Sequence, residues 1–426
     1  MSQAWVALAA LAVAVAISCT TTINVGVLSL ALAFVVGVFL NGMTVEAVLA
    51  GFPVPLLVTL VGVTLLFSIA ESNGTLGRLT ARAVAVCGGH AGLLPVMFFA
   101  IGFAIATIGA GATPASALLA PPAMAVAARA GISPLLMAIM VGNGALAGTL
   151  SPFAPTGIVA NGVMARIGLG GAEWETYAYN AAAHAIVGVG GFLLLGGWRL
   201  FAGAASRARL SAGAASRAPA YGESGPMTSA QWVTTAGIAA LIVGVAGFGL
   251  NVGMVALVVA TVLVLLRAVD EAMAIQRMPW HVILMVTGVT VLVTMVEKAG
   301  GLELITTGIA NVSTPASIAP VVAFGTGIVS IYSSTSGVVL PAFLPMVPDL
   351  AQRMGGMSPW PIAWSMNVGA SLVDLSSLST VGALFIAGAA PGTDTRRLFN
   401  GLLVWGLAMS IVGAGLCWLM FGVLLD

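Results

Sequence analysis

The chain has 426 residues and a formal net charge of +1; 60% of its residues are hydrophobic and 6% are charged. A soluble domain carries about 25% charged residues, so this composition excludes a water-soluble globular protein and predicts an all-α polytopic membrane protein. Nucleic-acid binding and a disulfide framework are not expected, because there is no basic patch with aromatic residues and the three cysteines stand alone in apolar runs.

The first half of the chain contains apolar runs long enough to cross a hydrocarbon core. They predict five transmembrane helices, at about 5–21, 24–40, 52–71, 134–165 and 175–200. No Lys or Arg precedes the first run, so it is interpreted as a helix and not as a signal peptide. A less apolar segment at 74–90 predicts an interfacial helix. The Gly-rich centre of 93–130 predicts a re-entrant hairpin, which enters and leaves the membrane by the same face.

A segment rich in Ala, Gly, Ser and Arg follows at 201–227 and predicts a solvent-exposed linker. After it the pattern of the first half returns. Transmembrane helices are predicted at 231–249, 251–267, 279–298, 359–390 and 398–424, with an interfacial helix at 300–314 and a second hairpin at 318–354.

Short motifs recur in the same order in both halves. "NVG" occurs at 24–26 and at 251–253, and "SP" occurs at 133–134 and at 358–359, which are separations of 227 and 225 residues. Because this nearly constant separation between matching motifs holds over most of both halves, it indicates an internal duplication. Five crossings per half is an odd number, so the second half is predicted to be inverted relative to the first.

The basic residues fix the expected orientation. With the N-terminus outside, eleven of the 14 Lys and Arg residues lie on cytoplasmic segments, in agreement with the positive-inside rule. This predicts a multi-pass protein of the bacterial inner membrane with extracytoplasmic termini and a cytoplasmic linker.

Four polar segments interrupt the predicted membrane helices. "SPFAPTG" at 151–157 combines two prolines, which remove backbone donors, with a glycine that permits non-helical dihedral angles. Its repeat partner is "VDLSSLSTVG" at 373–382, and the hairpin tips at 107–116 and 332–341 have the same character. Unwound backbone at membrane depth is tolerated only where it faces protein or a polar cavity. The four segments are therefore expected to converge near the midplane, as binding sites of secondary transporters do.

None of the four segments contains Lys or Arg. An anion bound there would be held by hydroxyl groups and by N–H groups at the starts of half-helices, at about 113, 157, 338 and 382. Backbone carbonyls and the carboxylate of Asp374 suit a hard cation such as Na⁺. Burial of a dianion without counter-charge is costly, so cation and anion are expected to bind together.

These arguments give two sets of candidate residues. The candidate substrate-binding residues are Gly111, Ala112, Thr113, Ser151, Pro152, Thr156, Gly157, Thr335, Ser336, Gly337, Ser377, Ser379 and Thr380. The candidate Na⁺ ligands are Thr107, Gly109, Asn143, Gly148, Ser333, Ser334, Asn367, Asp374 and Ser376. No other cofactor and no catalytic residue is expected.

The repeat, the paired hairpins and the paired broken helices resemble the divalent anion:sodium symporters of the ion transporter superfamily, and most closely the MatC-type dicarboxylate carriers. That superfamily has Ser-Asn-Thr at each hairpin tip, followed by Leu-Pro. In this chain the corresponding stretches are "GATPASALLAP" at 111–121 and "TSGVVLPAFLP" at 335–345, and Thr113, Thr335 and Ser336 keep hydroxyl groups there.

The resemblance implies an elevator-type homodimer that carries a small dicarboxylate of three to five carbons together with Na⁺. The implied scaffold is 1–72 and 228–298, and the implied arm helices are 73–92 and 299–317. The implied transport domain is 93–200 and 318–426.

Several alternatives stay open. His184 could relay protons or be a packed polar residue, and Asn143 and Asn367 could coordinate ions or tie the broken helix ends together. A proton-coupled carboxylate permease and a TRAP-type permease subunit would use similar parts. A cation/proton antiporter would need more than one buried acidic residue, and only Asp374 qualifies. An enzyme is not expected, since no Ser/His/Asp set, HExxH motif or phosphate loop occurs.

Overall fold

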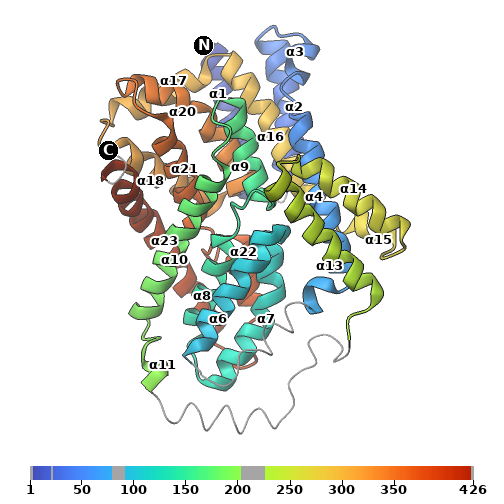
Figure 1. The fold of residues 1–426 in the computed structure, drawn as a ribbon. Coiled ribbons are helices and arrows are strands. Elements are labelled where there is room, and N and C mark those ends of the chain that lie inside the picture. The colour runs from blue at the N-terminus through green and yellow to red at the C-terminus, as the bar shows by residue number, and fades with distance from the viewer. Residues whose placement is uncertain (1–2, 21–22, 79–91, 203–225, 424–426) are drawn as a thin grey trace.

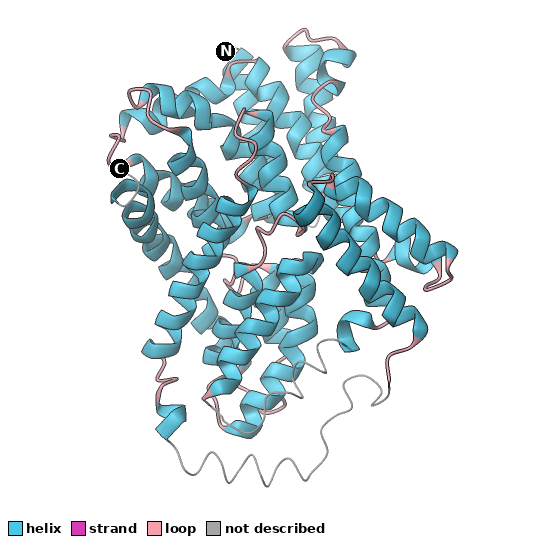
Figure 2. Cartoon of the chain, viewed as in Figure 1, coloured by secondary structure: helices cyan, strands magenta, loops and turns pink. Residues whose placement is uncertain are grey.

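The computed structural model describes residues 3–20, 23–78, 92–202 and 226–423 (Figure 1). Within these ranges the chain consists of helices and connecting loops, and Figure 2 shows no strand among them. The all-α expectation is confirmed for these residues. Most of the interfacial helix expected at 74–90 and of the linker expected at 201–227 lies outside them.

The helices of the first half follow the predicted order. They are α1 (Gln3–Thr20), α2 (Val25–Phe34) with the π-helix η1 (Val35–Leu40), α3 (Val45–Leu49), α4 (Val54–Ser72), α6 (Leu93–Ile105) with the π-helix η2 (Ala106–Ala110), α7 (Ala112–Ala130), α8 (Pro134–Ala147), α9 (Pro155–Arg166), α10 (Glu173–Leu194) and α11 (Arg199–Ala202). The short helix α3 lies between the transmembrane helices expected at 24–40 and 52–71.

The second half repeats this succession. Its helices are α13 (Ser229–Ile242) with η3 (Val243–Gly247), α14 (Val252–Leu265), α15 (Glu271–Gln276), α16 (Trp280–Lys298), α17 (Gly301–Asn311), α18 (Ile318–Tyr332), η4 (Thr335–Val339), α19 (Leu340–Phe343), η5 (Leu344–Met346), α20 (Val347–Arg353), α21 (Pro359–Leu372), α22 (Thr380–Ala387) and α23 (Thr395–Cys417) with η6 (Trp418–Val423).

Both helices that were expected to break do break. The first break comprises residues 148–154, between α8 and α9, and the second comprises residues 373–379, between α21 and α22. The first break was expected at 151–157. It ends three residues earlier because Pro155 occupies the first turn of α9, where its missing N–H group is no loss.

The outgoing arm of the second hairpin was expected to be one continuous apolar segment, and it is instead divided into η4, α19, η5 and α20. Pro341, Pro345 and Pro348 each fall in the first turn of one of these pieces. A proline interrupts the hydrogen-bond ladder of a helix and is best accommodated where a helix starts. The prolines thus explain the division.

Helices from different halves cross at glycines. A Cβ on Gly288 of α16 would lie 2.1 Å from the carbonyl oxygen of Gly26 of α2, and one on Gly62 of α4 would lie 2.4 Å from that of Gly253 of α14. Only glycine permits backbones to approach this closely. Gly26 and Gly253 are 227 residues apart, and Gly62 and Gly288 are 226 apart, so each half makes the same crossing with the other.

A second pair of close approaches lies within the halves. A Cβ on Gly144 of α8 would lie 2.2 Å from the oxygen of Phe99 of α6, and one on Gly369 of α21 would lie 2.4 Å from that of Ala323 of α18. Gly144 and Gly369 are 225 residues apart. The incoming arm of each hairpin therefore packs directly against the broken helix of its own half.

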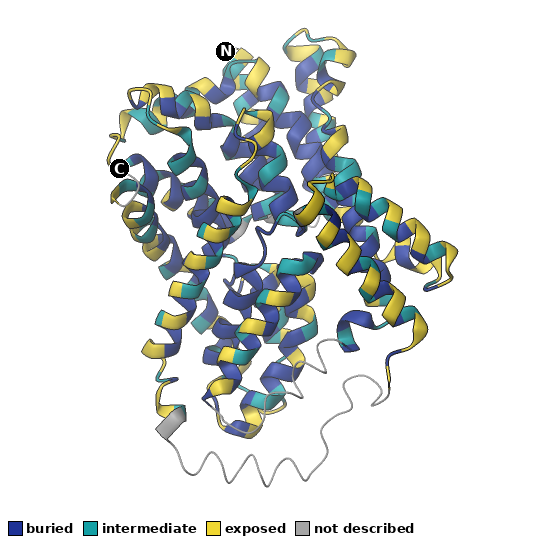
Figure 3. Cartoon of the chain, in the orientation of Figure 1, coloured by how far each residue is buried: buried dark blue, intermediate teal, exposed yellow. Residues whose placement is uncertain are grey.

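The two hairpins occupy different ends of the molecule. In Figure 1, α6 and α7 lie in the lower half of the view, whereas α18 and α20 lie in the upper half. Figure 3 shows the buried residues gathered on the inward faces of these helices. Among the described residues, five helices are long and apolar enough to cross a membrane, and α6 with η2 is one of them.

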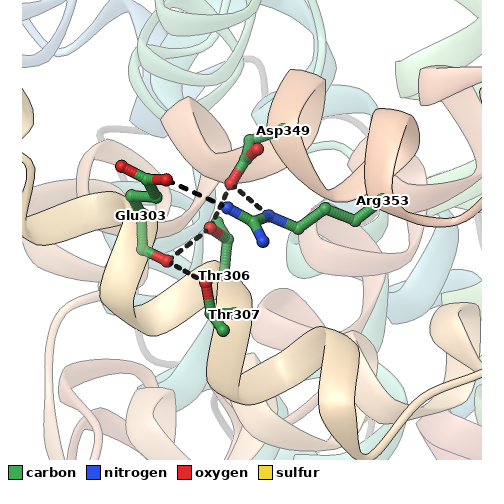
Figure 4. Close-up of polar contacts among 5 residues, drawn as sticks. All are labelled: Glu303, Thr306, Thr307, Asp349 and Arg353. Carbon is green, nitrogen blue, oxygen red and sulfur yellow. Dashed lines mark hydrogen bonds and ion pairs between the residues drawn. The ribbon is translucent and has the colours of Figure 1, made fainter.

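A polar cluster joins α17 to α20 at the upper end of the molecule (Figure 4). Arg353 of α20 lies 3.5 Å from a carboxylate oxygen of Glu303 of α17, and its Nε donates to Asp349 at 2.9 Å. The hydroxyl of Thr306, which is fully buried, donates to the same Asp349 carboxylate. These contacts fix the helix after α16 against the second hairpin.

The Arg353→Gln substitution is expected to lower the free energy of unfolding by less than about 1 kcal/mol, because its ion pairs are partly solvent-exposed. Thermal unfolding in detergent checks this, and added salt should remove most of the difference. A loss of several kcal/mol that salt leaves unchanged would contradict it.

Candidate functional site

Four helix starts meet around one polar cavity of about 280 Å³. They are the first residues of α7, α9, η4 and α22, and two of them come from hairpin tips and two from the ends of breaks. The cavity is lined by Ala112, Thr113, Leu146, Thr149, Thr156, Ser333, Ser334, Thr335, Ser336, Asp374, Leu378, Ser379, Thr380 and Val381.

The tip of the first hairpin turns through two glycines. Gly109 has φ 125° and Gly111 has φ 79°, in the region that favours glycine. A Cβ on Gly109 would also lie 2.2 Å from the ring of Phe67 in α4. The turn ends at Gly111, and α7 begins with Ala112 and Thr113 at the cavity.

The tip of the second hairpin uses serines in extended conformation. Ser333 has φ −131° and ψ 167°, and Ser334 has φ −77° and ψ 123°. The hydroxyl of Ser334 accepts from the N–H group of Gly337 at 3.1 Å and thereby caps η4. Ser379 caps α22 in the same way, with its hydroxyl 3.1 Å from the N–H group of Gly382.

Asp374 is the one charged side chain among the described residues that line this cavity. Its carboxylate accepts from the hydroxyl of Thr335 at 2.6 Å and from that of Ser330 at 3.3 Å. Thr335 is buried and Asp374 is half-buried. The break of one helix and the tip of the neighbouring hairpin thus share one carboxylate–hydroxyl cluster, which suits a hard cation.

The cavity has groups of both signs of charge. The first N–H groups of a helix have no acceptor within the helix, and the helix dipole adds partial positive charge there. Thr113, Thr156, Ser336 and Thr380 each lie in such a first turn and line the cavity. The carboxylate of Asp374 supplies negative charge beside them. An anion and a cation could therefore occupy neighbouring positions.

A second cavity of about 430 Å³ adjoins the first, and both are lined by Ala112, Thr113, Thr156, Ser334, Ser336 and Thr380. Its opposite wall is formed by α4, through Thr64, Phe67 and Ser68, and by residues before and within α16. The polar site therefore lies between the helix starts and these two long helices.

Three charged or titratable residues of the second cavity were not expected from the sequence. Glu71, Arg277 and His281 line it, and all three are exposed. Arg277 lies between α15 and α16, in a stretch that resembles an ordinary solvated loop in the sequence. No local signal marks it, because its position opposite the helix starts results from tertiary packing.

The structure brings together many of the candidate residues. Those that line one or both cavities are Gly109, Gly111, Ala112, Thr113, Thr156, Ser333, Ser334, Thr335, Ser336, Asp374, Ser379 and Thr380.

Other candidates hold the backbone around the first break. Ser151 is fully buried and donates to the carbonyl of Thr107 at 2.7 Å, and the Thr107 hydroxyl pairs with that of Tyr177 at 3.0 Å. A Cβ on Gly148 would lie 2.7 Å from the backbone N of Thr107. Pro152 lines a separate cavity of about 780 Å³.

The remaining candidates pack against one of the two breaks or deeper in the bundle. Gly157 and Gly382 each approach a backbone carbonyl of their own break, and Gly337 approaches the side chain of Met285. Ser376 accepts from the N–H group of Leu378, and Ser377 is buried. Asn367 donates to Met164 Sδ at 3.3 Å. Asn143 donates to the carbonyl of Ile139 at 2.9 Å, and its oxygen lies 3.0 Å from His184.

The first third of the chain matches a known protein family. Residues 1–149 match the family model of the dicarboxylate carrier protein MatC N-terminus. The matched region includes the first hairpin and ends inside the first break. The resemblance to MatC-type carriers is confirmed over these residues.

No curated protein matches the chain. Among solved structures, the chain is similar to the Alcanivorax borkumensis YdaH transporter, whose crystal structure is described as revealing an unusual topology. The TM-score is 0.53 at 13% identity, over 90% of this chain and 88% of that chain. At this identity the likeness shows a shared fold. Together with the apolar helices, the two comparisons support a multi-pass membrane transporter.

Proposed function

From the match of residues 1–149 to the dicarboxylate carrier MatC, we propose that this protein is a secondary transporter of the bacterial inner membrane that carries a small dicarboxylate together with Na⁺. The observation that carries the proposal is the meeting of four helix starts around a polar cavity that also contains Asp374.

The dicarboxylate would be held without Lys or Arg in the inner cavity. First-turn N–H groups and the hydroxyls of Thr113, Thr156, Ser336 and Thr380 would bind its carboxylates, as helix N-termini bind anions elsewhere. The cavity of about 280 Å³ limits the substrate to a small molecule. Dicarboxylates of three to five carbons are the proposed class.

The proposed Na⁺ site is the cluster of Asp374, Thr335 and Ser330. It combines one carboxylate with hydroxyl oxygens, and backbone carbonyls of the second break lie nearby along the chain. Asn143 and Asn367 are left out of this site, because neither lines the inner or the outer cavity. A bound Na⁺ would offset the charge of Asp374, and each further positive charge that is carried with the dicarboxylate gains about 2.3 kcal/mol per 100 mV of membrane potential.

The proposed mechanism is an elevator movement of an inverted-repeat protein. The crossings at Gly26 and Gly253 and the close approaches at Gly144 and Gly369 recur at the spacing of the duplication, which supports two structurally equivalent halves. The second cavity lies between the helix starts and the helices α4 and α16. In the proposal, the hairpins and broken helices move as one domain past a fixed scaffold that contains α4 and α16, in each subunit of a homodimer.

The test is a thermal-unfolding screen of the purified protein against mono-, di- and tricarboxylates, each in Na⁺ and in K⁺. A ligand of the folded state stabilises it by RT ln(1 + [L]/Kd). Stabilisation by dicarboxylates in Na⁺ and not in K⁺ is the expected result. If neither Na⁺ nor any carboxylate changes the midpoint temperature of thermal unfolding, the proposed function is wrong.

Arg277 gives a separate prediction. Because its exposed guanidinium lines the outer cavity, Arg277→Gln should weaken dicarboxylate binding by about fivefold at low ionic strength and much less at high salt. The measurement is the Kd at two salt concentrations. Arg267→Gln is the control, since Arg267 is exposed and lines neither cavity. Equal effects of both substitutions would contradict a local role of Arg277.

A further inference from the structure

A buried polar quartet lies apart from both cavities. It consists of Asn143 in α8, Asn180 and His184 in α10, and Ser371 in α21, all with fully buried side chains. His184 Nδ1 lies 3.0 Å from Asn143 Oδ1, and His184 Nε2 lies 3.1 Å from Ser371 Oγ. The hydroxyl of Ser371 has one hydrogen, which it donates to Asn180 Oδ1. The quartet is a continuous set of polar contacts across three helices.

Two members of the quartet, Asn180 and Ser371, lie next to the helix breaks. The amide nitrogen of Asn180 donates to the carbonyls of Leu146 at 2.9 Å and Ala147 at 3.3 Å, which are the last two residues of α8 before the first break. Ser371 is the penultimate residue of α21, directly before the second break. The quartet therefore connects the starting points of the two breaks.

Three of the four quartet residues have apolar counterparts in the other half of the chain. "IVG" occurs at 186–188 in α10 and at 411–413 in α23, which aligns the two helices at a spacing of 225. At that spacing His184 corresponds to Met409 and Asn180 to Trp405, and Ser371 corresponds to Leu146. Three of the four residues thus have apolar counterparts, Met409 and Trp405 in the second half and Leu146 in the first.

A buried polar group is costly unless it is hydrogen-bonded. Apolar residues fill the counterpart positions in the other half. Packing therefore does not explain why this half has polar side chains there, and another role is indicated. We propose that Asn143, Asn180, His184 and Ser371 are positioning residues that couple cation binding at the second break to substrate binding at the first. The inference rests on the proposed function.

The coupling follows from the connectivity. Na⁺ at Asp374 would order the second break, which starts two residues after Ser371. Ser371 contacts Asn180, and Asn180 bonds the carbonyls of Leu146 and Ala147, where the first break starts. Ordering of the second break would therefore also order the start of the first. That break ends at α9, whose Thr156 lines the substrate cavity. Ordering by one ligand reduces the entropic cost of binding the other, so Na⁺ raises the affinity for the dicarboxylate.

The test compares Ser371→Ala with Ser365→Ala. Both serines are fully buried in α21, but the hydroxyl of Ser365 has no hydrogen-bond partner among the described residues. The measured quantity is the ratio of the dicarboxylate Kd without Na⁺ to that with Na⁺. Ser371→Ala should lower this ratio by about tenfold and leave the Na⁺-free Kd unchanged. Ser365→Ala should keep the wild-type ratio.

His184→Met is the second variant, because methionine occupies the equivalent position 409 in the second half. It should fold and lower the ratio by less than Ser371→Ala does, because the contact of Ser371 with Asn180 remains. A wild-type ratio in both variants would overturn the inference. Failure of both to fold, while Ser365→Ala folds, would also overturn it, since the quartet would then be a requirement of the fold. If the dicarboxylate Kd of the wild-type protein is the same with and without Na⁺, the proposed function itself is wrong.

Discussion

Asp374→Asn is expected to reduce Na⁺-driven dicarboxylate uptake by at least about 100-fold. Removal of one partner from a fully buried charge pair costs about 3–5 kcal/mol. Asp374 is half-buried, so a cost at the low end of about 3 kcal/mol is expected, and each 1.4 kcal/mol is a factor of ten in affinity. Asparagine keeps the shape of the side chain and can still bond Thr335 and Ser330. The substitution therefore removes the charge that would hold Na⁺ and leaves the surrounding hydroxyl groups in place.

Uptake into proteoliposomes with an imposed Na⁺ gradient measures this effect, and thermal unfolding with and without Na⁺ shows whether cation binding is lost with it. Asp394→Asn is the matched control. Asp394 caps α23 with its side chain, and asparagine caps a helix about as well as aspartate, so uptake should be unchanged. If Asp374→Asn keeps Na⁺-dependent uptake, Asp374 is not a ligand of the coupling ion.

Gly382→Ala is expected to abolish substrate binding and to destabilise the protein. A Cβ at position 382 would lie 2.0 Å from the carbonyl oxygen of Ser376 and 2.6 Å from its carbonyl carbon. Because these are backbone atoms of the break itself, the clash cannot be relieved by a side-chain rotation. Overpacking of this kind costs about 1–3 kcal/mol or more. Relief requires the break to move away from α22, which would displace Ser379 and Thr380 from the cavity.

Gly157→Ala should behave in the same way at the first break, since its Cβ would lie 2.0 Å from the carbonyl oxygen of Ser151. Gly415→Ala is the control, because Gly415 lies inside α23 with no atom within 4 Å of its added Cβ, and alanine favours a helix over glycine by about 1 kcal/mol. The thermal midpoint and the dicarboxylate Kd are measured for all three. If Gly382→Ala has the same dicarboxylate Kd as Gly415→Ala, the prediction is wrong, and the second break can move without loss of binding.

The sequence by itself determined the order of the long helices and the places where two of them break. These features depend on local chemistry: Pro155 can start a helix but not continue one, Gly109 and Gly111 can adopt positive φ, and Ser379 can cap α22. The duplication is likewise predicted from residue order alone. Hence the four helix starts were predicted within three residues of their positions in the structure.

Only the tertiary structure decided which side chains face the cavity. Pro152 and Thr156 lie four residues apart, yet they line different cavities. Asn143 was expected to be an ion ligand or a tie between broken helices, and its contact with His184 comes from another helix. Arg277 reaches the outer cavity from a loop without any motif. Backbone conformation follows from neighbouring residues, whereas the direction of a side chain and its partners follow from how distant helices pack.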